Sequence, residues 1–184
     1  KRVQASSFTM LSGATLTTAT LSPAIDPTKS FLVFGVEENA APPVDGQISG
    51  QITNATTLTF QRAAGNTGNI RVTWWVAEFT SGVRVLRGAA TLGPASPGDL
   101  TVPLAPAVDP RRSFPLISLR TSGSSYEGSD FARAEITGGG ANLSLYLSNG
   151  INSPVAEWQV VEYTDAEVQS GPLTFVHPDP SKTA

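Results

Sequence analysis

The chain has 184 residues, a net charge of −3, 40% hydrophobic residues and no cysteine. The absence of cysteine excludes disulfide bonds, thiolate metal sites and cysteine nucleophiles. The acidic balance, the lack of a basic run longer than Arg111-Arg112 and the lack of an apolar stretch long enough for a bilayer argue against nucleic-acid binding and membrane insertion.

Alternating apolar and polar residues predict strands along the whole chain, and helical periodicity is nearly absent. In the first half, strands are expected near residues 3–10, 14–21, 30–36, 47–53, 56–62 and 69–79. In the second half, strands are expected near residues 84–92, 99–104, 113–120, 131–136, 141–147 and 155–163. Turn-forming residues separate these runs. The sequence therefore predicts an all-β protein.

Two segments of the first half return in the second half. Pro23–Phe31 returns as Pro106–Phe114, 83 positions later, and Trp74–Phe79 returns as Trp158–Tyr163, 84 positions later. Two pairs at nearly the same offset define a tandem repeat. We therefore predict two antiparallel β-sandwich modules related by internal duplication.

The opening strand of the repeat occurs three times, as Val3–Met10, Val85–Leu92 and Val168–Phe175. The predicted units are residues 1–82, residues 83–176 with a surplus strand at 167–176, and a flexible tail at 177–184. We expect Val85–Leu92 to close the first module while opening the second, and Val168–Phe175 to close the second. The alternative is that the terminal strands are exchanged between subunits, because an unpaired apolar edge strand recruits a partner.

Four aromatic residues occupy equivalent positions in the two units and are predicted to hold the cores: Trp74, Trp158, Phe31 and Phe114. Trp75 is different, because the equivalent position of the second unit is Gln159 and the fold does not need an aromatic residue there. Trp75 is either half-covered by a loop or the other module, or a contact for a neighbouring subunit or ligand. The predicted interface residues are Trp75, Val168, Gln169, Leu173 and Phe175.

No residue set predicts a catalytic, cofactor or metal site. The one histidine, His177, lies in the predicted tail, which is a poor place for a catalytic base. Two groups of carboxylates flank equivalent loops and offer at most a weak divalent-ion site: Glu37, Glu38 and Asp45, and Glu127 and Asp130. Gly138–Gly140 is interpreted as a hairpin connection, and the Asp-Pro pairs at Asp26 and Asp109 as rigid turns.

Several of these segments together resemble a repeat of tailed-phage virion proteins and bacterial surface proteins. The resemblance is carried by four segments: Val168–Gly171, Ile25–Phe31, Thr53–Phe60 and Trp74–Phe79. It covers nearly the whole chain, but it marks scaffold positions, and the second unit departs from it at 138–141. The second half is also faintly similar to the H-type lectin sandwich, without any sugar-binding residue that can be placed.

The resemblance implies a non-enzymatic structural or display subunit of a phage virion, such as a fibre, tail or capsid decoration protein. The alternatives are a subunit of an extracellular bacterial filament and a carbohydrate-binding module. The expected partners are copies of the chain and other virion or filament proteins, and for the third alternative a host-surface glycan. The expected location is the virion or the cell surface. A charged content of only 15% suits permanent contacts, although an ordinary β-rich protein shares it. Because the chain begins with Lys1, we expect that a leader or preceding sequence has been removed.

Overall fold

The computed structural model describes residues 1–38, 43–65, 67–93, 98–121, 131–147 and 153–171. The first half contains six strands: β1 (Arg2–Met10), β2 (Leu16–Thr20), β3 (Ser30–Glu38), β4 (Ile48–Asn54), β5 (Thr57–Arg62) and β6 (Ile70–Glu78). The second half repeats them: β7 (Val83–Thr91), β8 (Gly98–Pro103), β9 (Ser113–Arg120), β10 (Ala132–Thr137), β11 (Asn142–Leu147) and β12 (Val155–Tyr163). The predicted all-β fold of two related modules is confirmed.

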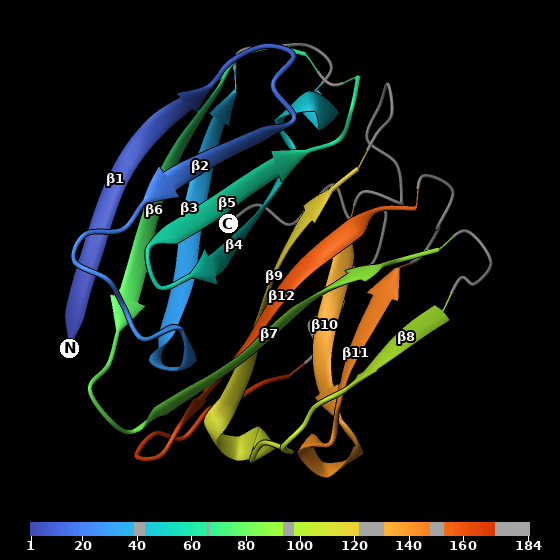
Figure 1. Ribbon diagram of the computed structural model, residues 1–184. Coiled ribbons are helices and arrows are strands. Elements are labelled where there is room, and N and C mark those ends of the chain that lie inside the picture. The colour runs from blue at the N-terminus through green and yellow to red at the C-terminus, as the bar shows by residue number, and fades with distance from the viewer. Residues whose placement is uncertain (39–42, 66, 94–97, 122–130, 148–152, 172–184) are drawn as a thin grey trace, which may run out of the picture.

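Each half forms two three-stranded antiparallel sheets with the same strand order. Module 1 (β1–β6) has the sheets β1-β6-β3 and β2-β5-β4. Module 2 (β7–β12) has the sheets β7-β12-β9 and β8-β11-β10. In Figure 1 the sheet β7-β12-β9 lies between module 1 and the sheet β8-β11-β10. Module 2 therefore turns the outer face of one of its sheets toward module 1.

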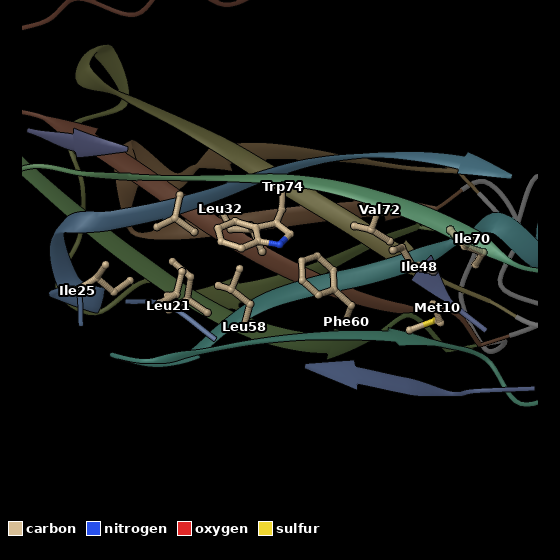
Figure 2. Close-up of a cluster of buried hydrophobic side chains, with 12 residues drawn as sticks. Met10, Leu21, Ile25, Leu32, Ile48, Leu58, Phe60, Ile70, Val72 and Trp74 are labelled. Carbon is tan, nitrogen blue, oxygen red and sulfur yellow. The ribbon is translucent and has the colours of Figure 1, made fainter. Parts of the chain in front are cut away.

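A hydrophobic core fills each module, because alternate residues of every strand point between its two sheets. In module 1 the strands β6 and β5 supply Val72, Trp74 and Phe60, which are 0%, 4% and 0% exposed. Figure 2 shows Trp74 and Phe60 meeting between the sheets. In module 2, Trp158 is 8% exposed and lies in the equivalent cluster. The two tryptophans are thus buried at equivalent positions.

Short 3-10 turns precede the third strand of each module, where the Asp-Pro pairs predicted turns. They are η1 (Pro27–Lys29) and η3 (Pro110–Arg112). The carboxylate of Asp26 accepts the Thr28 N–H, and that of Asp109 accepts the Arg111 N–H, so each aspartate caps its turn. The bonds from Thr28 are also the main reason why the pKa of Asp26 is lowered. A further 3-10 turn, η5 (Gly138–Gly140), connects β10 to β11 as expected.

The prediction that Val85–Leu92 serves both modules is wrong. β7 is an edge strand that pairs with β12, and module 1 completes its two sheets with its own six strands. Module 2 likewise uses six strands of its own. The described part of the surplus strand, Val168–Gly171, is not in a strand, and the rest lies outside the described residues. The sequence of the first strand recurs because each module has its own first strand. No strand is shared between the modules, since the six strands of each module already complete its two sheets.

Candidate functional site

The two modules meet where the outer face of the sheet β7-β12-β9 covers the open edges of β3 and β4. At its centre, the Gln159 amide bonds both backbone groups of Leu32: its oxygen accepts the Leu32 N–H at 2.9 Å, and its nitrogen donates to the Leu32 carbonyl at 2.9 Å. Gln159 is 8% exposed. One amide side chain therefore satisfies the donor and the acceptor that an edge strand leaves unpaired.

Arg87 of β7 extends the same contact toward η1. Its guanidinium donates to the Ser30 carbonyl at 2.8 Å and also to the Pro27 carbonyl. Burial lowers the pKa of Arg87 to about 10, and the nearby carboxylate of Asp26 acts in the opposite direction. Arg87 stays protonated at neutral pH and holds the beginning of β3 on module 2.

Two polar residues of module 2 contact the edge strand β4. The Ser118 hydroxyl accepts the Gly50 N–H at 3.1 Å, and the Arg120 guanidinium donates to the Ser49 hydroxyl at 2.6 Å. Arg120 also pairs with Glu157 at 3.3 Å. Burial raises the pKa of Glu157, and the pairing with Arg120 limits that rise. The junction thus protects both open edges of module 1 with hydrogen bonds.

Aromatic side chains close the end of the junction next to the link between the modules. Phe31 lies 6.2 Å from Phe79 and 6.4 Å from Phe114, measured between ring centroids, and Tyr163 lies 5.5 Å from Phe79. Phe31 and Phe114 are half-buried and pack in this third cluster, beside Val83, Val85 and Val161, rather than in a module core. This placement differs from the expected one because both residues project from the outer faces of their sheets.

The face of module 1 that corresponds to the junction face of module 2 is exposed. Ala5, Trp75 and Val33 form one row across β1, β6 and β3, as Arg87, Gln159 and Leu116 do in module 2. Trp75 and Val33 are each 44% exposed, and Val3 beside them is 64% exposed. We call these four residues, Val3, Ala5, Val33 and Trp75, the Trp75 face. It is an exposed apolar face of the sheet β1-β6-β3.

The remaining predicted interface residues lie after module 2. The Val168 N–H donates to the Arg111 carbonyl at 2.7 Å, so the chain passes η3 there. Gln169 is exposed. Leu173 and Phe175 lie outside the described residues. The structure therefore does not bring Trp75 together with Val168 and Gln169 into one described surface.

The carboxylates singled out in the sequence do not form a metal site within the described part of the chain. No group of three or more His, Asp or Glu residues able to hold a metal ion occurs among the described residues. Asp45 accepts the Thr67 N–H at 2.8 Å and the Thr67 hydroxyl at 2.9 Å. Glu127, Asp130 and His177 lie outside the described residues. In the same described ranges, no helix reaches the length and apolarity needed to cross a membrane.

The environment of the Glu38 carboxyl group leads to a prediction about how the stability of the fold depends on pH. Burial raises the pKa of Glu38, and the nearby Asp45 carboxylate raises it further. Because the raised pKa penalises the charged form in the folded state, stability is highest below the unfolded pKa and falls as pH rises through the folded pKa. Glu38→Gln should therefore gain stability over the parent near pH 7 and lose that advantage near pH 4. Denaturant unfolding at both pH values checks this, and an advantage that is larger at pH 4 would contradict it.

Comparison of the chain with protein-family models, with curated proteins and with solved structures finds no match to any of them. The candidate site is consequently defined by its geometry: a junction in which one module covers the strand edges of another, and an equivalent exposed face on the first module.

Proposed function

We propose that the protein is a non-enzymatic structural subunit of a phage virion, of the fibre, tail or capsid decoration kind, and that it works through permanent contacts with copies of itself and other virion proteins. The observation that carries the proposal is the Trp75 face. Its counterpart in module 2 is covered, whereas Trp75 itself is 44% exposed. A contiguous exposed apolar face in a water-soluble domain is typical of an interaction site.

The resemblance of the repeat to tailed-phage virion proteins is the reason why the proposal names a phage virion. The same exposed face favours one second candidate, a subunit of an extracellular bacterial filament, because stacking of identical modules suits both. The genes that neighbour the coding sequence distinguish the two: virion genes support the first candidate, and secretion or surface-anchoring genes support the second.

Electron microscopy of the purified chain tests the structural role. We expect concentration-dependent assemblies built of repeated modules, together with only background rates in a broad screen of hydrolase substrates. Single particles at every concentration would contradict self-assembly. A turnover that one point substitution abolishes would contradict the non-enzymatic role.

A further inference from the structure

Within the described part of the chain, each of the two surfaces that meet in the junction has a less buried counterpart on the other module. Module 1 carries the Trp75 face, and module 2 carries the edge formed by Pro115 of β9 with Arg133 and Ala134 of β10, called here the β9–β10 edge; none of these three residues is fully buried. In module 1 the equivalent edge is covered, because Gln159 bonds the Leu32 backbone and Ser49 is only 1% exposed. In module 2, Pro115 is half-buried and Arg133 is exposed.

The centre of the internal junction is formed by Leu32 and Gln159. On the counterpart surfaces both residues are replaced, and the hydrogen-bonding groups of the two replacements again match each other. Pro115 is opposite Val160 as Leu32 is opposite Val76, so Pro115 occupies the position of Leu32. Leu32 offers a donor and an acceptor, which the Gln159 amide matches. Pro115 has a carbonyl but no N–H. Trp75, which replaces Gln159, has an N–H donor but no acceptor. Trp75 therefore suits Pro115 as Gln159 suits Leu32, and its ring can pack on the proline ring.

A second pair of contacting residues, at the β4 end of the junction, is also replaced on both counterpart surfaces. Arg120 is opposite Val155 as Glu37 is opposite Arg71, so Glu37 takes the place of Arg120. Arg133 is opposite Tyr146 as Ser49 is opposite Gln61, so Arg133 takes the place of Ser49. An arginine–serine contact inside the molecule thus corresponds to a glutamate and an arginine, which attract each other. Both side chains are exposed.

Two contacts of the junction have no such counterpart. Ala5 stands where module 2 has Arg87, and Gly35 stands where it has Ser118, so the bonds of these two side chains to β3 and β4 cannot be repeated. A contact made by the Trp75 face is consequently more apolar than the internal junction. With these bonds missing, we expect it to be weaker than the internal junction, which suits association between separate chains.

We propose that a second copy of this chain places its Trp75 face on the β9–β10 edge, so that the junction inside the molecule recurs between molecules. This inference deepens the proposed function, on which it rests, by naming the surface and the partner. The two surfaces are different, so the contact is heterologous, and its repetition gives head-to-tail linear assemblies rather than closed dimers.

Cysteine cross-linking tests the pairing directly, because the natural chain has no cysteine. We would mix the single variants Glu37→Cys and Arg133→Cys and add a short bismaleimide. We expect a covalent dimer in the mixture and almost none with either variant alone. The double variant should give a ladder of oligomers. Dimers from Glu37→Cys alone would show a symmetric contact and overturn the proposal.

Substitutions on the two surfaces test the energetics by sedimentation velocity. Trp75→Gln copies the residue of module 2 and should weaken association on the order of 30-fold, as loss of a central aromatic contact does, without moving the unfolding midpoint of the monomer. The control is Leu16→Gln on β2 of the other sheet, where Leu16 is 51% exposed; it should leave association unchanged. Glu37→Arg and Arg133→Glu should each weaken association about tenfold, and the double reversal should restore it.

The outcomes separate this proposal from the proposed function. Assemblies in the microscope without the Glu37–Arg133 cross-link would overturn the proposed pairing and leave the structural role standing. Monomers at every concentration would overturn both. Association that appears only after removal of residues 167–184 would show that the chain's own tail, which passes η3 at Val168, occupies the edge, and this would also overturn the pairing.

Discussion

Trp74→Ala and Trp158→Ala are each expected to destabilise the protein by about 3–5 kcal/mol, the range for truncation of a large buried aromatic side chain. Trp74 is 4% exposed and Trp158 is 8% exposed, each in the core of its module. Denaturant unfolding of dilute protein measures the loss. Trp75→Ala is the control: because Trp75 is 44% exposed, it should cost less than about 1 kcal/mol. A larger loss for Trp75→Ala than for Trp74→Ala would contradict the assignment of the two faces.

Gly88 makes the Trp158 result more specific. A Cβ atom on Gly88 would lie 2.6 Å from the Trp158 ring. Gly88→Ala should therefore destabilise the parent by about 1–3 kcal/mol through overpacking, and it should cost much less in the Trp158→Ala background, where the ring is gone. Equal costs in both backgrounds would show that the ring and the glycine do not interact.

Gln159→Leu is expected to cost about 2–4 kcal/mol, because it leaves the N–H and the carbonyl of Leu32 buried without partners. Both bonds measure 2.9 Å, and Gln159 is 8% exposed. Unfolding experiments give the loss of stability. Amide hydrogen exchange provides the specific measurement, since the Leu32 amide should exchange faster while the amides of β5 change little.

Gln4→Leu is the matched control for this substitution. The Gln4 amide also bonds one backbone donor and one backbone acceptor, the Ser22 N–H at 2.9 Å and the Pro23 carbonyl at 2.8 Å, but in an exposed position. Water can replace both bonds, so the cost should stay under about 1 kcal/mol. Equal losses for Gln159→Leu and Gln4→Leu would mean that burial at the junction is not the source of the effect.

The fold could be predicted from the sequence because local patterns determine it. The alternation around Trp74 marks a strand with one buried face, and the return of the same strand at Trp158 reveals the second module. Comparison of the two repeats also singled out Trp75 as a position where the fold does not need an aromatic residue, but it left open whether a loop or the other module covers it. Short stretches of sequence are thus enough to predict the strands of both modules.

The junction could not be predicted, because it depends on how two modules lie against each other. Gln159 looked like a neutral replacement for Trp75, yet it bonds the buried backbone of a residue 127 positions away. Phe31 and Phe114 were expected in the cores since nothing local distinguishes a core face from a junction face. One signal was present: a polar residue at a position that is aromatic in the sister repeat.

The division of the chain into two self-contained modules has a consequence for its synthesis. Module 1 ends with β6 at Glu78, so it can fold while the ribosome is still translating module 2. The residue that covers the β3 edge, Gln159, is made about 80 codons later, an interval on the order of 4 to 16 s at ordinary elongation rates. During that interval β3 and β4 remain open to the nascent chains of neighbouring ribosomes. Slower translation of the second half should therefore increase aggregation of newly made protein more than slower translation of the first.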